Sequence, residues 1–250
     1  MDAIREMQLE IVKIINKIDI VFKENNIQYF LLGGSVLGAV RHKGFIPWDD
    51  DMDIGIKRSD FQKAEALLLT LNEYVYETTE NHIIPDGPTG HIHLVNEKYS
   101  IENSPTIDVF ALDGIPDDFD EWKKIRSKAN WYHLAVLNRP ALNRGFIKQM
   151  ITFILLKIIP QNIWNKIKIH SFKKITSYGV DEAPYIANFF GAWGEKEYFP
   201  RSMFDSVTIG EFEGLKLPMP ANPHEYLSQM YGNYMELPPI EKRIPKHKKI

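Results

Sequence analysis

An acidic, alternating segment is the feature that most constrains the fold of this 250-residue chain. Residues 51–56 alternate polar with apolar side chains, which predicts a half-buried β-strand. Because side chains alternate between the faces of a strand, Asp51 and Asp53 share one face while the apolar residues enter the core. Their carboxylates then lie roughly 6–7 Å apart along the strand. Like charges on a partly buried face repel and are costly to desolvate, and a divalent cation removes that cost.

A glycine motif precedes the acidic segment. The apolar residues 29–32 predict a short strand that ends in Gly33, Gly34 and Ser35. Glycines let a substrate phosphate approach the backbone, and a following helical turn over 36–42 offers N–H groups at its positive end. We expect the Ser35 hydroxyl to donate to a phosphate oxygen. A phosphate cradle beside a carboxylate-bound metal is suited to the transfer of a phosphorus-containing group.

A third carboxylate stands in similar surroundings, because Asp108 lies between apolar residues on a predicted strand over 106–112. A sheet can bring it beside Asp51 and Asp53. Hard oxygen ligands of this kind suit Mg²⁺. Each piece is common by itself, and an Asp-rich turn is more often a solvated surface. The ordered set of strand, Gly-Gly-Ser, helix, Asp-x-Asp strand and later Asp is far more specific.

This order resembles the nucleotidyltransferase fold, whose glycine motif and three acidic residues follow one another in the same way. The segment RHKGFIPWDDDMDIGI (41–56) further resembles the signature of the LicD family, which transfers phosphocholine-type groups to cell-surface glycans. FFGAWGEKEYFP, FEGLKLPMP and YGNYMELPP in the C-terminal half are also similar to that family. The similarity spans roughly residues 25–240.

The resemblance implies roles for particular residues. Asp51 and Asp53 would bind Mg²⁺, and Asp108 would complete the metal site or take a proton from the acceptor. The donor phosphate would be held by the glycine motif with further neighbouring residues: Gly33, Gly34, Ser35, Arg41, His42, Lys43 and Trp48. Asp49 and Asp50 match the signature and receive no role beyond loop structure or support of the site.

The resemblance also implies the reaction. The donor would be a CDP-alcohol such as CDP-choline. The acceptor would be a hydroxyl of a glycan or lipid-linked glycan precursor, of teichoic acid, lipopolysaccharide or capsule type, and CMP would leave. Two alternatives stay open: transfer of NMP from an NTP to a small molecule or protein, and a non-catalytic scaffold. The intact acidic set argues against the scaffold, because a decayed member is expected to lose a metal ligand.

The pattern of elements predicts an α+β (α/β) class, with a nucleotidyltransferase-like mixed sheet followed by a mainly helical C-terminal part. In the first part we expect helices over 4–22 and from a cap at Ser59 or Asp60 to about Leu71, and strands near 74–78 and 91–95. In the second part we expect helices over 118–178 broken at Pro140 and Pro160, a hairpin turning at Glu213-Gly214, and a helix from Asn222 to Tyr231. We expect residues 1–115 to form the catalytic core. Residues 116–250 should pack on it and bind the acceptor.

Composition narrows the function classes. Cysteine is absent, which excludes a disulfide scaffold and thiolate chemistry, and the net charge of −3 gives no basic field for nucleic acid. The N-terminus lacks the apolar core of a signal peptide, and no apolar run approaches ~20 residues. We expect a cytoplasmic protein, with action at the inner face of the membrane as an alternative.

Four further features leave choices open. The apolar stretch 146–159 favours a buried core helix over an interfacial helix near a lipid-linked acceptor. The basic tail 242–249 is typical of a solvated terminus, with anionic lipid or substrate phosphate as the alternative partner. His91 and His93 favour an ordinary strand face over a metal site. Four aromatic residues fit a quaternary-ammonium cage and core filling equally well: Trp48, Trp193, Tyr198 and Tyr231.

Overall fold

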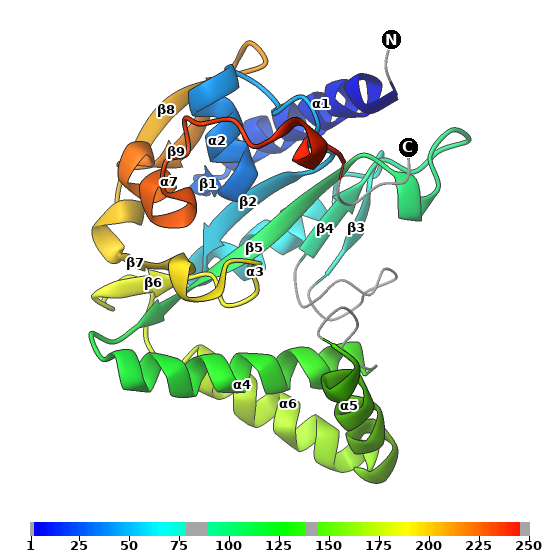
Figure 1. Ribbon diagram of the computed structural model, residues 1–250, viewed down its shortest axis with the longest axis vertical. Coiled ribbons are helices and arrows are strands. Elements are labelled where there is room, and N and C mark those ends of the chain that lie inside the picture. The colour runs from blue at the N-terminus through cyan, green and yellow to red at the C-terminus, as the bar shows by residue number, and fades with distance from the viewer. Residues whose placement is uncertain (1–2, 79–89, 139–144, 246–250) are drawn as a thin grey trace.

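The computed structural model describes residues 3–78, 90–138 and 145–245. These residues form a mixed α/β fold, in which a twisted sheet carries helices and a separate layer of helices lies below it (Figure 1). The predicted class, a mixed-sheet core with a mainly helical later part, is confirmed. The Pro/Gly-rich loop that the sequence suggests before residue 90, Pro140 and the end of the basic tail lie outside the described residues.

The main sheet has the strand order β1-β2-β5-β4-β3. At the far end of β5 two more strands join the sheet: β6 pairs with β5, and β7 pairs with β6. These strands are β1 (Tyr29–Leu31), β2 (Met52–Lys57), β3 (Val75–Glu77), β4 (Gly90–His93), β5 (Thr106–Ile115), β6 (Tyr185–Ala187) and β7 (Tyr198–Pro200). β2 and β5 run parallel, and the other neighbours in this sheet are antiparallel. Sequence analysis missed β6 and β7, which have only three residues each.

One face of the sheet is covered by α1 (Ala3–Glu24) and α3 (Arg58–Leu68), which contact each other and β5. The amphipathic pattern predicted for α1 is confirmed, since Ile11, Ile14, Ile15 and Ile18 are buried in the main core. The predicted cap of α3 is wrong. Strand β2 runs directly into the helix, so Lys57 occupies the N-cap position without a side-chain hydrogen bond and Ser59 lies inside the first turn.

The other flank of the sheet holds α2 (Gly33–His42), the hairpin of β8 (Val207–Phe212) and β9 (Leu215–Pro220), and α7 (Pro223–Tyr231) (Figure 1). Helix α2 begins at Gly33, so the glycines form its first turn instead of preceding it. The hairpin turn is confirmed, because Glu213 (φ 51°) and Gly214 (φ 80°) both have the positive φ of a type I′ turn. The cap of α7 is confirmed as well: the Asn222 side chain accepts from the Glu225 N–H.

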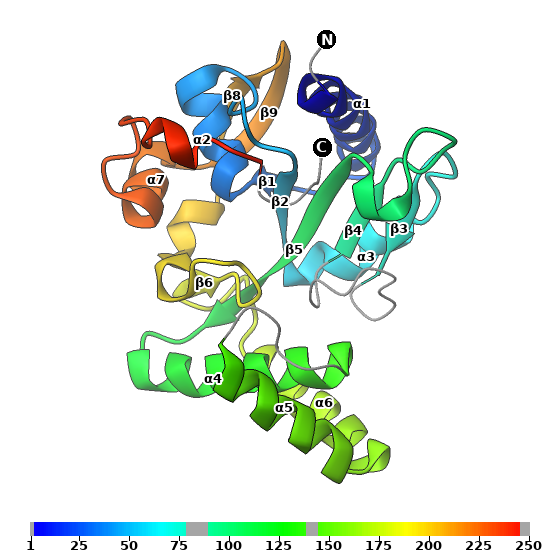
Figure 2. The same ribbon diagram turned by 45° about the vertical axis from the view of Figure 1, so that its right-hand side comes forward.

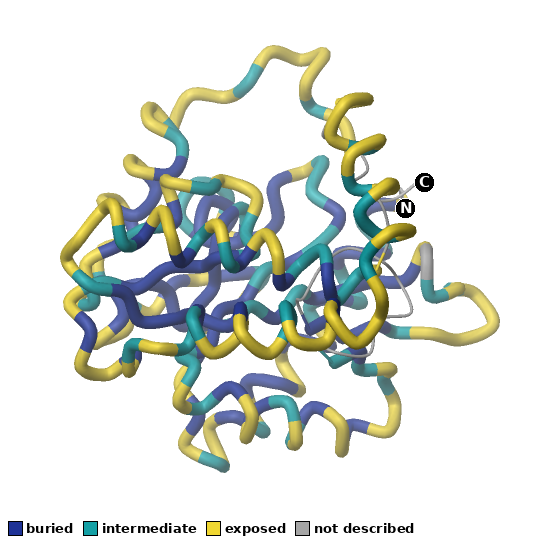
Figure 3. The backbone as a smooth tube through the Cα atoms, turned by 90° about the horizontal axis from the view of Figure 1, so that it is seen from below, coloured by how far each residue is buried: buried dark blue, intermediate teal, exposed yellow. Residues whose placement is uncertain are grey.

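Three helices form what we call the helical arm: α4 (Phe119–Leu137), α5 (Phe146–Ile158) and α6 (Gln161–Ile175). They form the lower layer in Figures 1 and 2, and exposed and half-buried residues predominate along them in Figure 3. Helices α4 and α6 pack together around a second core, whereas α5 buries no residue. The expectation that residues 146–159 form a buried core helix is therefore wrong. Within the described residues, no helix is long and apolar enough to cross a bilayer.

The main core combines the first 115 residues with C-terminal elements, since it includes side chains of β9 and α7 such as Leu217 and Leu227. The C-terminal strands and α7 therefore pack directly on the sheet that β1 to β5 form. The assignment of residues 116–250 to acceptor binding stays a prediction.

A two-point ion pair joins these layers. Arg58 at the start of α3 donates from Nε to Oδ1 of Asp113 (2.7 Å) and from Nη2 to Oδ2 (2.9 Å). Asp113 on β5 is 1% exposed, and the Arg58 guanidinium also lies over the ring of Phe172 on α6. The pair thus links the sheet, α3 and the helical arm.

We predict that Arg58→Met destabilises the protein by about 3 kcal/mol, because it leaves the buried Asp113 carboxylate without its partner. Urea unfolding measures the loss. Lys13→Met, which removes an exposed ion pair with Glu10, is the control and should cost little. A loss below about 1 kcal/mol for Arg58→Met would contradict this role of the pair.

Candidate active site

Three carboxylates converge on the face of the sheet opposite α1 and α3. Asp53 on β2 and Asp108 on β5 are directly paired across the parallel strands, and Asp51 lies two residues before Asp53. Each of the three offers one oxygen, and these oxygens lie within 4.8 Å of one another. The structure thus brings together the three acids that the sequence singled out. All three are half-buried.

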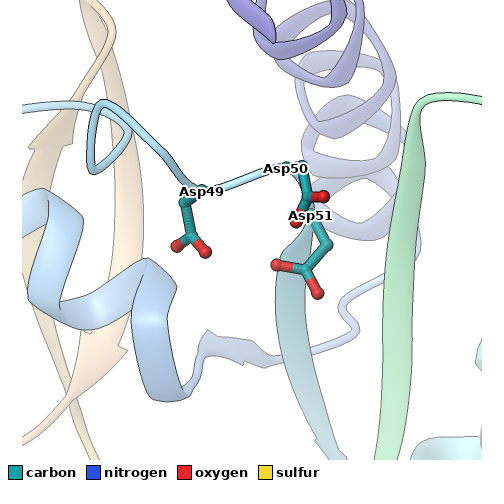
Figure 4. Close-up of side chains that lie close together, drawn as sticks. All are labelled: Asp49, Asp50 and Asp51. Atoms are coloured by element: carbon teal, nitrogen blue, oxygen red, sulfur yellow. The ribbon is translucent and has the colours of Figure 1, made fainter. Parts of the chain in front are cut away.

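The loop before β2 adds to this charge. Asp49, Asp50 and Asp51 also offer oxygens within 4.8 Å of one another, and Figure 4 shows their carboxylates on the same side of the loop. Gln8 of α1 holds the loop in place, because its Nε2 donates to the carbonyl oxygens of Ile46 (3.2 Å) and Asp49 (2.8 Å). Sequence analysis had no signal for this use of a helix glutamine.

The glycine motif faces the acids directly. A Cβ at Gly33 would lie 2.9 Å from Oδ2 of Asp53, and one at Gly34 would lie 2.8 Å from Oδ2 of Asp49. Gly33 also has φ +50°, which disfavours any residue with a Cβ. The first turn of α2 and the carboxylates therefore border the same space, where a ligand could contact both.

Ser35 has a structural contact that was not expected. Its Oγ accepts a hydrogen bond from the Asp53 N–H (2.9 Å), and the residue is 5% exposed. The hydroxyl thus ties α2 to β2 beside the acids, while its donation to a phosphate stays a prediction. The Gly33 N–H donates to the hydroxyl of Tyr226 on α7 (2.9 Å), a contact across 193 residues for which the sequence held no signal.

The basic run lies at the other end of α2, about 12 Å from Gly33 along the helix axis. Nη1 of Arg41 donates to the carbonyl oxygen of Tyr234 (2.7 Å), and its Nε contacts Nε2 of His42. Lys43 closes the helix with φ 60°. The structure therefore does not place this run beside the glycines, and its contact with donor phosphate stays a prediction.

The expected aromatic cage is divided. Trp193 and Tyr231 meet edge to face, with ring centroids 4.9 Å apart, and the Tyr231 hydroxyl lies 3.6 Å from the Cβ position of Gly33. Tyr198 stacks instead on Tyr185 at the second core, and Trp48 lies under the guanidinium of Arg243. Of the four aromatic residues, Tyr231 therefore lies beside the glycine motif, and Trp193 packs against Tyr231.

His91 borders the acids on the β4 side. It is the cross-strand neighbour of Asp108, and its Nδ1 lies 2.8 Å from Oδ1 of Asp108. His93, two residues on, contacts Ser104 and Thr106 instead. The expectation of an ordinary strand face missed the contact of His91, although the alternation of the strand already placed both histidines on one face.

Negative charge accumulates at this site. The pKa of Asp53 is raised well above its ordinary value by burial and by the charges of Asp51 and Asp108. Burial and the charge of Asp53 also raise the pKa of the Tyr231 hydroxyl. A bound cation would relieve both effects. Three converging carboxylates are hard oxygen donors, so the residues present fit Mg²⁺.

Glu197 is a further buried acid near these groups. It is 5% exposed, and its Oε1 accepts from the N–H of Trp193 (2.8 Å). Burial raises its pKa from 4.5 to about 7. The residue therefore supports the loop that carries Trp193, and sequence analysis missed it because nothing marks one glutamate as buried.

Comparison with known proteins identifies a family and two kinds of relative. A family model described as the LicD/FKTN/FKRP nucleotidyltransferase domain matches residues 26–151, which include the glycine motif and all three converging acids. The chain is 28% identical to the lipopolysaccharide cholinephosphotransferase LicD of Haemophilus influenzae, across 98% of this chain and 96% of that protein. A segment of 47 residues is 47% identical to the ribitol 5-phosphate transferase FKRP of human and mouse, covering 19% of this chain and 10% of those proteins.

We predict that Glu197→Gln flattens the pH dependence of stability in the absence of divalent metal. Because the folded-state pKa is raised, the contribution of Glu197 is fully present below pH 4.5 and is lost as pH rises through about 7. The free energy of unfolding should therefore rise by up to about 3 kcal/mol at pH 8 in the variant, and change little at pH 4.5. Urea unfolding at the two pH values measures this. Glu195→Gln, an exposed neighbour, is the control, and equal pH slopes for both variants would contradict the prediction.

Proposed function

Because the chain belongs to the LicD/FKTN/FKRP family, we propose that it is a Mg²⁺-dependent phosphotransferase. It moves a phospho-alcohol from a CDP-alcohol onto a hydroxyl of a cell-surface glycan precursor and releases CMP. The observation that carries this proposal is the convergence of Asp51, Asp53 and Asp108 within 4.8 Å, opposite the first turn of α2. The names of the two kinds of relative, both phospho-alcohol transferases, support the reaction type.

We assign metal binding and phosphate binding to different residues of the site. Asp51, Asp53 and Asp108 would hold Mg²⁺, which offsets charge on the donor phosphates and on the leaving CMP. The absence of a Cβ at Gly33 and Gly34 lets the Asp53 and Asp49 carboxylates approach the first turn of α2, so a phosphate beside the bound metal would also meet the positive end of that helix. The acceptor hydroxyl oxygen forms a bond to the phosphorus that bears the alcohol, and the bond from that phosphorus to CMP breaks.

The proton of the acceptor hydroxyl passes to Asp108 or to water. Asp108 is suited to receive it because it is half-buried and adjoins the space between the other acids. His91 contacts Oδ1 of Asp108 and thereby restricts how that carboxylate can turn. We assign His91 a positioning role, since it touches the acid and not the reacting atoms.

Choline is our candidate for the transferred alcohol. The name of the Haemophilus influenzae relative supports it, and so does the ring of Tyr231, which packs against Trp193 and lies beside Gly33, where an aromatic ring favours a quaternary ammonium. We propose lipopolysaccharide or a related surface glycan as the acceptor, and action in the cytoplasm. These finer assignments rest on the relatives and on the aromatic pair.

We predict that Asp53→Asn lowers turnover at least 100-fold, while the metal-free protein melts at the same or a higher temperature. The variant keeps the shape of the side chain but weakens a metal ligand. It also removes a carboxyl group whose pKa is raised because burial and the neighbouring acids disfavour its charged form. Asp120→Asn on the exposed start of α4 is the matched control. Near-normal turnover of Asp53→Asn at saturating Mg²⁺ would refute the metal assignment.

We predict that the purified protein with Mg²⁺ releases CMP from a CDP-alcohol, slowly onto water and faster with a glycan acceptor. Mass spectrometry of the nucleotide products would compare CDP-choline, CDP-ethanolamine, CDP-ribitol, CDP-glycerol and the four NTPs. Pyrophosphate release from an NTP, with every CDP-alcohol intact, would replace the proposal by NMP transfer. Consumption of no nucleotide would favour the scaffold.

A further inference from the structure

Helix α5 carries its apolar face outward. At about 100° per residue, seven of its nine large apolar side chains fall within one arc of roughly 160°. Each of them is at least 40% exposed: Phe146, Ile147, Met150, Ile151, Phe153, Ile154 and Ile158. The opposite side, which includes Gln149 and Thr152 together with Leu155 and Leu156, is half-buried. The helix is therefore apolar on its exposed side as well, and an exposed apolar patch of this kind marks an interaction site.

The exposed apolar face lies at one extremity of the molecule. Figures 1 and 2 show α5 and the end of α6 that follows it at the bottom of the long axis, away from the sheet. Ile163, Ile169 and Phe172 of α6 are also at least 40% exposed. With 13 residues, α5 is about 20 Å long, too short for a hydrocarbon layer of about 30 Å. A partner that covers this face would therefore lie along the helix, because α5 is too short to pass through a bilayer.

The charge around the face indicates which partner fits. Residues 146–175 contain no Asp or Glu, in a chain whose net charge is −3. They contain six lysines: Lys148, Lys157, Lys166, Lys168, Lys173 and Lys174. Lys157, inside the apolar arc and near the C-terminal end of α5, places its ammonium 4.4 Å from the ring centroid of Phe153. Apolar side chains bordered by lysines match the boundary between acyl chains and anionic headgroups.

A hollow between α4 and α6 has the same chemistry. It has a volume of about 360 Å³ and is lined by Lys128, Lys166 and His170 together with Trp131 and Ile163. Trp131 is 38% exposed, and tryptophan is enriched where membrane meets water. The hollow can accept an anionic headgroup beside an apolar wall.

We propose that α5 and the lysine-bearing face of α6 form a docking surface for an anionic lipid membrane, with α5 lying in the plane of the interface. A second copy of the chain fits less well, because two apposed 146–175 segments would bring their lysines together without an acidic residue from either segment, although Lys174 already pairs with Glu121 of α4. This proposal does not rest on the proposed transferase activity, since the arm lies apart from the three acids.

Vesicle co-sedimentation of the full chain tests the proposal. We expect binding to vesicles of phosphatidylcholine with 30% phosphatidylglycerol, and at least tenfold weaker binding to phosphatidylcholine alone. The double variant Ile151→Glu/Ile154→Glu should lose at least tenfold in binding to the anionic vesicles. Ile209→Glu/Ile240→Glu adds the same charges at side chains that are as exposed but lie elsewhere, and should bind as the unchanged protein does.

Two further measurements keep the outcome decisive. Lys166→Gln/Lys173→Gln leaves the apolar face intact and should also weaken binding to anionic vesicles about tenfold, even if the glutamate variant fails to fold. Asp53→Asn should bind vesicles normally, which separates docking from the transferase chemistry. Equal binding to both vesicle types, or binding to neither, would overturn the proposal. So would a dimer in sedimentation velocity that Ile151→Glu/Ile154→Glu abolishes.

Discussion

Repulsion between carboxylates is the constraint around which this structure is organised. The parallel pairing of β2 with β5 is in register at Asp53 and Asp108, so the fold itself forces two acids side by side. Asp51 adds a third, and the raised pKa of Asp53 expresses the resulting cost. Other interactions must therefore offset this electrostatic cost for the sheet to be stable. The apolar residues on the reverse face of the same strands, sealed by α1 and α3, supply the burial that keeps the sheet together.

The elements around the acids are held by contacts from distant parts of the chain. Gln8 fixes the acidic loop from α1, Ser35 joins α2 to β2, and Tyr226 meets the first N–H of α2 from α7. Each contact orders backbone, so the carboxylates have little freedom to move apart. The three acids are thus held in place by contacts from α1, α2 and α7 before any ligand binds.

The sequence predicted the centre of this arrangement better than its surroundings. Strand alternation put Asp51 and Asp53 on one face, and the order of motifs, through its resemblance to a known fold, indicated that Asp108 lies beside them. Tyr226 and Glu197 could not be found in this way, since their roles depend on contacts between residues far apart in sequence and on burial. The prediction failed outright for residues 146–159, where apolar composition indicated burial but no partner helix covers the face among the residues that the structure describes.

Strand β5 has one more consequence. It carries Asp108 near its start and ends at Ile115, beside the second core and the helical arm. Seven residues of strand span up to about 23 Å. The strand thereby separates the three acids from the helical arm by up to that length. If the arm rests on a bilayer as proposed, an acceptor anchored in the same bilayer would have to extend away from it to reach the acids.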